Sequence, residues 1–322
     1  MRGGVVHRRI LHGVIGMVAF LGLVMAGPAS AYDLPSVNLG FTSFLDGGPP
    51  AGPGFYYTQY LQYYHSDKLA DQHGNRLLPP GADESLDVWV ALFQFIYQSN
   101  YEVFPTARWG LDVIVPLVSL DLQHSLGGPP LDNGTGMGDL LVGPFLQFDP
   151  IMGSKGPIFM HRIEFQMLIP TGKYDDTKAL NPGSNFFSLD PYWAGTWFIT
   201  PKWTTSWRIH YLWNAENSDP NTIGAHDTQA GQAVHLNFAT EYELWEKRLR
   251  AGLNGYYLKQ VTDSKTNGAD VADSREQVLG LGPGVVFHYS QNTHFFLNLY
   301  FETAVENRPE GYRLNMRWVQ HF

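Results

Sequence analysis

Hydrophobic residues recur at every second position along most of the chain after residue 54. In residues 202–214, one set of alternate positions carries Trp203, Thr205, Trp207, Ile209, Tyr211 and Trp213. The positions between them carry Lys202, Thr204, Ser206, Arg208, His210 and Leu212. A β-strand points alternate side chains to opposite faces, whereas a helix would scatter the apolar set around its circumference. The pattern therefore predicts a strand with one apolar face and one largely polar face.

Twelve runs of this kind extend to the end of the chain. They cover residues 55–65, 86–98, 108–121, 139–149, 157–169, 186–198, 202–214, 229–242, 247–260, 275–289, 294–304 and 311–322. Most contain ten or more residues, whereas strands in soluble sheets usually contain about five or six. A tilted strand needs about 9–11 residues to cross a bilayer. The run lengths therefore indicate strands that span a membrane.

The connections between the runs alternate in length. Long polar segments such as His65–Ser85 follow the odd-numbered runs, and short ones such as Thr200–Pro201 follow the even-numbered runs. The connection before the last run, Ala304–Gly311, is of moderate length. Bacterial outer-membrane barrels combine short periplasmic turns, long external loops and an even number of strands. We therefore predict an all-β fold, a transmembrane antiparallel β-barrel of 12 strands over residues 54–322, with both termini on the periplasmic side.

A soluble β-sandwich is the competing architecture, with shorter strands and polar outward faces. The last run favours the barrel, because its apolar face (Tyr312, Leu314, Met316, Trp318) alternates with a polar face (Arg313, Asn315, Arg317). A barrel in lipid must be apolar outside and closed, since no backbone edge can stay unpaired in hydrocarbon. We expect the last strand to pair with the first, with Trp318 facing lipid and Phe322 in the periplasmic aromatic girdle.

Residues 1–31 have the pattern of a secretory signal peptide. Three arginines precede an apolar stretch, Ile10–Gly27, and the A-x-A sequence at residues 29–31 fits a cleavage site. An uncleaved membrane anchor is the alternative, and His12 within the apolar stretch disfavours it. We expect export through a cleaved signal and a location in the outer membrane of a Gram-negative bacterium.

Residues 32–53 precede the first predicted strand. Their Pro/Gly-rich end, Leu45–Gly54, cannot hold a regular ladder. A disordered periplasmic linker is one interpretation, but such a linker rarely carries many apolar residues. We interpret the segment as a plug inside the barrel lumen, with candidate plug residues Val37, Leu39, Phe41, Phe44 and Leu45.

Composition excludes several classes of protein. The chain has no cysteine, so disulfides and thiolate sites are absent. Loss of residues 1–31 removes three arginines and leaves 18 basic against 30 acidic residues, a net charge of −12. This balance argues against a nucleic-acid partner, whose phosphates require a basic surface. No later stretch has the 18 apolar residues of a transmembrane helix, and we expect no cofactor.

Charged side chains occupy the predicted inner faces. The candidate lumen or constriction residues are Arg162, Glu164, Arg208, His210, His235, Glu241, Arg248, Arg250, Glu302, Arg313 and Arg317. Charges of both signs on facing strands predict ion-pair networks that narrow the barrel and set what passes. A purely structural role in stiffening the interior is the alternative, and the two roles are compatible. Mixed sign argues against strong ion selectivity.

Other motifs are weaker. Gly134–Asp139 opens a strand rather than a helix, so it lacks the context of a phosphate-binding loop. Asp132, Asn133 and Asp139 offer oxygens that could bind calcium, although glycine turn chemistry explains them as well. Ser206, His210 and His235 share the inner face and make a barrel hydrolase the main enzyme alternative, but no nucleophile motif accompanies them.

Six stretches have a recognisable pattern: Met137–Pro144, Asn181–Trp197, Asp227–Leu244, Ala251–Lys265, Leu279–Tyr289 and Glu306–Phe322. Together, within a likeness over nearly the whole chain after residue 31, they resemble the MetA-pathway phenol-degradation family of outer-membrane proteins. The resemblance implies a monomeric 12-stranded outer-membrane channel whose N-terminal segment enters the lumen. It implies uptake of small hydrophobic or aromatic compounds for degradation and supplies no catalytic residues.

The resemblance also implies partners. These are outer-membrane lipid and lipopolysaccharide, the small hydrophobic or aromatic solute, and the barrel-assembly machinery, which reads a terminal Phe such as Phe322. Gln320 departs from the apolar residue usual two places before that Phe. We therefore predict a channel for passive uptake and not an enzyme. The alternatives are an outer-membrane hydrolase using His210 and His235, or a structural or adhesive barrel that transports nothing.

Overall fold

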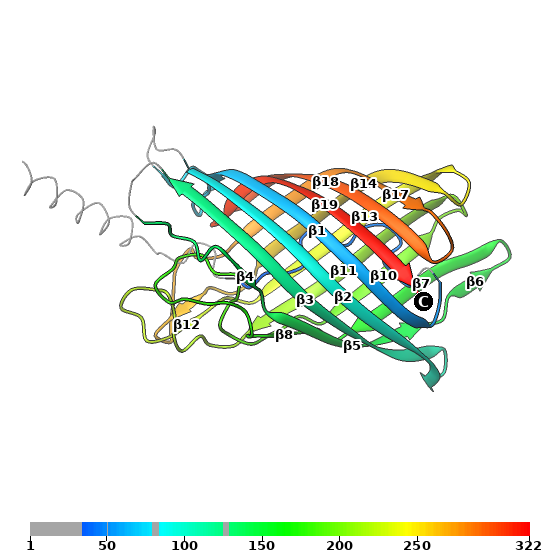
Figure 1. The fold of residues 1–322 in the computed structure, drawn as a ribbon, viewed down its shortest axis with the longest axis horizontal. Helices are drawn as coiled ribbons and strands as arrows, with labels where there is room; N and C mark the ends of the chain where they lie inside the picture. Colours follow the sequence, from blue (N-terminus) through cyan, green and yellow to red (C-terminus); the bar gives the residue numbers. More distant parts are fainter. Residues whose placement is uncertain (1–33, 50, 79–83, 125–128) are drawn as a thin grey trace, which may run out of the picture.

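The computed structural model describes residues 34–49, 51–78, 84–124 and 129–322 (Figure 1). The predicted signal peptide, residues 1–31, lies outside the described residues. Twelve spans form one closed antiparallel barrel. In chain order they are β1 (Gly54–Leu69), β2 (Glu84–Phe104), β3 (Ala107–His124), β4 with β5 (Thr135–Met137, Leu140–Phe148), β7 with β8 (Gly156–Glu164, Met167–Ile169), β9 with β10 (Ser188–Leu189, Tyr192–Phe198), β11 (Trp203–Asn214), β13 (Ala233–Trp245), β14 (Leu249–Gln260), β17 (Gln277–His288), β18 (Thr293–Glu306) and β19 (Pro309–His321).

The last strand closes the barrel, as predicted. β1 pairs with β2 on one side and with β19 on the other, where Tyr56 lies opposite His321 and Gln62 opposite Asn315. Remaining short strands extend the connections. β6 (Ile151–Gly153) lengthens the turn before β7, and β12 (Thr228–Gln229), β15 (Lys265–Thr266) and β16 (Ala269–Asp270) form a small sheet in the external loops. The predicted transmembrane barrel is confirmed.

Four strands, β1, β2, β3 and β18, extend past both ends of the predicted runs. β2 covers Glu84–Phe104, for example, and not only 86–98. Backbone pairing continues into water beyond the lipid, where no alternation of side chains is required, so the hydrophobic pattern marks only the membrane section. The connection before the last strand is also shorter than predicted, because β18 reaches Glu306 and β19 begins at Pro309. Ala304 and Asn307 have positive φ angles of 52° and 53° that accommodate this turn.

Three neighbouring spans are interrupted, which the alternation did not predict. The breaks fall at residues 138–139, 165–166 and 190–191. Pro191 has no N–H for the ladder, and the Asp139 carboxylate instead accepts hydrogen bonds from the backbone N–H groups of Gly172 and Ser184. Single backbone bonds, such as Asp190 N to Gln166 O at 2.8 Å, bridge the wall at this level. Apolar and polar residues continue to alternate in the sequence through these breaks, because the side chains still point alternately outward and inward where the backbone pairing is irregular.

Aromatic side chains encircle both ends of the outer surface. At the end near the C-terminus, Tyr57 lies 5.7 Å from Trp318 and Phe55 lies 6.0 Å from Phe322, measured between ring centroids. At the opposite end of the same strands, Tyr63 lies 4.7 Å from the Trp89 ring. Such paired girdles mark the two interfaces of an outer-membrane barrel. In the described part of the chain, no helix has the length and hydropathy needed to cross a bilayer.

Candidate functional site in the barrel lumen

The N-terminal segment, residues 34–49, runs through the interior of the barrel (Figure 1). Its backbone is held by side chains from separate strands. Gly40 N donates to Asn237 Oδ1 at 2.8 Å, and Gly40 O accepts hydrogen bonds from Tyr300 at 3.0 Å and from Asn315 at 3.1 Å. Asn237 belongs to β13, Tyr300 to β18 and Asn315 to β19. Wall side chains therefore replace the ladder partners that this irregular segment lacks.

A second group of contacts fixes the end of the segment nearer to β1. Gly47 N donates to Thr196 Oγ1 at 2.8 Å, and the Gln147 side chain donates to Gly47 O at 3.1 Å. Asp46 forms a bidentate pair with Arg208, with Nε to Oδ2 at 2.7 Å and Nη2 to Oδ1 at 2.8 Å. Both side chains are at most one-tenth exposed. This is the one ion pair among the described residues that ties residues 34–49 to the wall.

The five candidate plug residues all lie on this segment but differ in burial. Leu39 is buried in a cluster that includes Tyr256 and Tyr300, and Val37 packs against the same cluster. Phe44 is fully buried in a second cluster, the Phe44 cluster, which consists of Phe44, Tyr56, Ala239, Val286, Phe296 and Val319. Phe41 is half-buried and its ring lies 5.8 Å from the Tyr60 ring. Leu45 is half-buried, with a φ of 55° that turns the chain toward Asp46.

Buried guanidinium groups line the lumen, and three of them combine an acid partner with an aromatic ring. Arg313 Nε lies 3.2 Å from Glu302 Oε1, and its guanidinium carbon lies 4.1 Å from the Tyr64 ring centroid. Arg162 and Arg208 stack likewise, at 4.0 Å on Phe145 and 4.2 Å on Tyr192. Such cation–π stacks give the wall flat surfaces with polar edges.

The remaining lumen candidates are also buried, with one exception. Glu164 accepts a hydrogen bond from Tyr192 at 2.5 Å, and Glu241 accepts one from Thr204 and lies 3.8 Å from Arg250. Arg317 stacks on Phe296 at 3.6 Å. Arg248, in contrast, is exposed in the turn between β13 and β14, where it donates to Tyr289 O. The prediction for Arg248 is wrong because its run begins in the turn, before the alternation starts at β14.

His210 and His235 lie opposite each other on β11 and β13, and Asp190 joins them. Asp190 Oδ2 lies 3.0 Å from His210 Nδ1, and Asp190 Oδ1 lies 3.0 Å from His235 Nε2. All three side chains are at most 1% exposed. Asp190 is not among the site residues predicted from the sequence, although its position before Pro191 on the sixth predicted run placed it on a strand beside β11.

The trio offers three metal-ligand atoms, but its geometry does not suit a metal. The imidazole rings are stacked with centroids 4.0 Å apart and planes inclined by only 16°. A histidine lone pair lies in its ring plane, and two nearly parallel planes do not meet within a metal–nitrogen bond of about 2.0–2.1 Å. Two parallel N–H groups donating to the two oxygens of one carboxylate fit these distances. We interpret the trio as a hydrogen-bonded unit of the wall.

The serine of the hydrolase alternative is engaged elsewhere. Ser206 Oγ lies 3.0 Å from Thr196 Oγ1 and accepts a hydrogen bond from Leu45 N at 3.1 Å. Among the described residues, neither His210 nor His235 is hydrogen-bonded to Ser206. A nucleophile and its base must lie within hydrogen-bond reach of each other. The described geometry therefore contains no serine–histidine nucleophile at this place.

Turn chemistry also accounts for the candidate calcium residues. Asp132 accepts hydrogen bonds from Leu122 N and Gly134 N, both at 2.9 Å. Asp139 is occupied by Gly172 and Ser184. The Asn133 side chain donates to Asn181. Since these side chains serve their own loops, we favour the glycine-turn interpretation over a calcium site.

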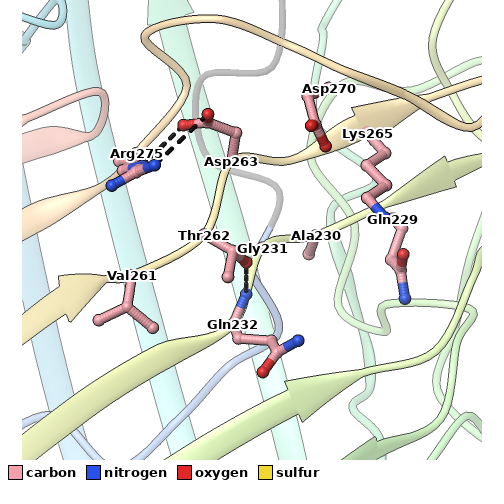
Figure 2. Close-up of a pocket in the computed structure, with 10 residues that line it drawn as sticks. All are labelled: Gln229, Ala230, Gly231, Gln232, Val261, Thr262, Asp263, Lys265, Asp270 and Arg275. Atoms are coloured by element: carbon pink, nitrogen blue, oxygen red, sulfur yellow. Dashed lines mark hydrogen bonds and ion pairs between the residues drawn. The ribbon is translucent and has the colours of Figure 1, made fainter.

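One hollow of about 310 Å³ lies among the external loops (Figure 2). It is lined by Gln229, Ala230, Gly231, Gln232, Val261, Thr262, Asp263, Lys265, Asp270 and Arg275. Asp263 accepts a hydrogen bond from Arg275 at 2.7 Å, which raises the pKa of the Arg275 guanidinium. The hollow is built from loop residues outside the membrane section, so the lumen remains the better candidate for a path across the membrane.

A closed barrel that is apolar outside, aromatic at both rims and polar inside defines an outer-membrane β-barrel protein. The family model described as "Putative MetA-pathway of phenol degradation" matches residues 66–318, and the chain belongs to this family. The resemblance noted from the sequence is thereby confirmed.

Solved structures share the fold. The COG4313 outer membrane channel from Pseudomonas putida F1 has 18% identity and a TM-score of 0.73, covering 89% of this chain and 100% of that one. The translocator domain of the autotransporter NalP from Neisseria meningitidis has 6% identity and a TM-score of 0.48, covering 84% and 89%. The CymD monoaromatic hydrocarbon channel has 8% identity and a TM-score of 0.40, covering 85% and 91%. A search of curated proteins gave no match.

Proposed function

We propose that this protein is an outer-membrane channel for passive uptake of small hydrophobic or aromatic compounds, and that residues 34–49 control its bore. The observation that carries the proposal is the position of this segment inside the barrel, where its backbone is held by individual hydrogen bonds to wall side chains, such as those of Gly40 and Gly47, and not by a strand ladder. Such bonds can be exchanged for water or solute, so the segment can move without unfolding the wall. A moved segment opens a route through the lumen.

The lining supports aromatic solutes. Guanidinium faces stack on Tyr64, Phe145, Tyr192 and Phe296 along the interior, and aromatic rings favour such surfaces. Most of the lumen arginines also have an acid partner, as Arg313 has Glu302, so little net charge remains to select ions. The description of the family supports a link to the breakdown of phenols.

Several features accompany this proposal. We propose that the chain is exported through a cleaved signal at residues 1–31 and acts as a monomer without enzymatic activity. Its expected partners are outer-membrane lipid, lipopolysaccharide and the barrel-assembly machinery that reads Phe322. The outward aromatic rims, with the Trp318 ring 5.7 Å from Tyr57, support the lipid contact.

Flux across a defined membrane tests the function. Proteoliposomes with an outer leaflet of lipopolysaccharide should take up radiolabelled 4-hydroxybenzyl alcohol faster than protein-free liposomes. A variant without residues 37–53 should be faster again. A structural or adhesive barrel predicts no flux from either protein, which would refute the proposal. Hydrolysis of an ester substrate that disappears in His235→Ala would support the enzyme alternative instead.

A further inference from the structure

A glycine row on β17 makes room in the lumen wall beside the N-terminal segment. Gly280, Gly282 and Gly284 occupy alternate positions, so all three face inward with Val278 and Val286. At Gly284 a Cβ would lie 2.0 Å from Asn254 Oδ1, 2.5 Å from Asn298 Oδ1 and 2.9 Å from Phe44 Cε2. Two wall amides and one plug ring therefore converge on the space that this missing side chain leaves.

The two amides have no partner at this point. Asn254 and Asn298 are fully buried, on β14 and β18, the two strands that flank β17. Among the described residues, neither Nδ2 nor Oδ1 of either side chain has a hydrogen-bond partner. Buried amides are nearly always paired. Four unpaired amide atoms in one place therefore point to a group that is not part of the chain.

The Phe44 ring, which lies beside the two amides, cannot form hydrogen bonds with them. Phe44 is 0% exposed and packs against Tyr56, Ala239, Val286, Phe296 and Val319. This surrounding fits an aromatic ring closely, but a phenylalanine ring has no atom that donates or accepts a conventional hydrogen bond. The five side chains around Phe44 therefore form an apolar box with two aromatic rings, and the two unpaired amides border this box.

We propose that the box is the binding site for a monoaromatic solute that carries a hydroxyl group, and that Phe44 is an internal occupant which this solute displaces. The ring takes the place of Phe44, and the hydroxyl donates to one amide oxygen and accepts from the other amide nitrogen. Displacement of Phe44 removes a main anchor of residues 34–49, so binding favours the open lumen. The inference rests on the proposed channel function and names its solute class.

A binding measurement, independent of transport, tests the site. In detergent-solubilised Phe44→Ala protein, 4-fluorophenol should bind at least tenfold tighter than to the unsubstituted protein, as followed by fluorine NMR. It should also bind at least fivefold tighter than fluorobenzene, which lacks the hydroxyl. Adding Asn254→Leu and Asn298→Leu should abolish this preference and leave fluorobenzene binding. Phe44→Leu repeats the test with less loss of packing if Phe44→Ala does not refold.

A matched control is Phe41→Ala, which removes a ring from the same segment beside Tyr60. It should create no hydroxyl preference. Equal affinity of Phe44→Ala for the two probes would mean that water serves the amides, and this result overturns the inference, as does an unchanged affinity. Tight binding of 4-fluorophenol without flux in proteoliposomes would instead retain the site and refute the channel.

Discussion

The ion pair between Asp46 and Arg208 should control how often the lumen opens. Asp46→Asn removes the charge from the segment side and leaves the barrel wall unchanged. In the structure the pair makes two charge-assisted hydrogen bonds, at 2.7 and 2.8 Å, between side chains that are at most one-tenth exposed. Solvent screening at such a place is weak, so the pair should contribute substantially to holding residues 34–49.

The expected magnitude follows from the chemistry of the pair. Hydrogen bonds to charged groups contribute roughly 1.5–3 kcal/mol. Loss of that amount corresponds to an increase of about 10- to 140-fold in the equilibrium constant for release of the segment. Single-channel recording in planar bilayers should therefore show a rise in open probability of about this factor, until the open state dominates.

Two comparisons make the result specific. Asp219→Asn changes an exposed acid in an external loop and should leave the open probability unchanged. Arg208→Gln combined with Asp46→Asn should open no more than the more open of the two single variants, because both remove one interaction. An open probability of Asp46→Asn within twofold of the unsubstituted protein would refute the assignment of this pair as the anchor.

Three further predictions concern the wall and the closing strand. One equivalent of zinc should leave the thermal unfolding midpoint unchanged, because the stacked rings of His210 and His235 do not converge; a zinc-dependent rise that His235→Gln abolishes would contradict this. Gly280→Val should lower the free energy of unfolding in urea by about 1–3 kcal/mol, since a Cβ there would lie 2.3 Å from the Tyr256 ring, and an unchanged midpoint would speak against this packing. Phe322→Ala should reduce assembly in cells, which is measured as loss of the heat-modifiable form on gels. The variant should refold normally in detergent, because the Phe322 side chain is 72% exposed. Equal assembly of the variant and the unsubstituted protein in cells would show that the barrel-assembly machinery does not recognise Phe322.

The barrel and the facing of most of its residues could be predicted from the sequence. Strict alternation has a period of two, which divides the side chains of a strand between two faces. The apolar face is then assigned to lipid and the polar face to the lumen. The alternation placed Arg208, His235, Arg313 and Arg317 on the inner face correctly. It failed at Arg248, where a turn replaced the strand, and at the three interrupted spans, where facing continues although the ladder does not.

Which inward-facing residues contact one another could not be predicted, because it depends on the tertiary structure. Alternation gives the face of a residue but not its height along the barrel relative to strands elsewhere in the wall, which depends on the register of every pair between them. Asp190 therefore became a partner of His210 and His235 only through the register of its span with β11 and of β11 with β13. Residues 34–49 show no periodic pattern in the sequence, because their backbone forms hydrogen bonds with side chains of the wall and not with a neighbouring strand. The meeting of Phe44 with Asn254 and Asn298 over Gly284 was for this reason invisible in the sequence.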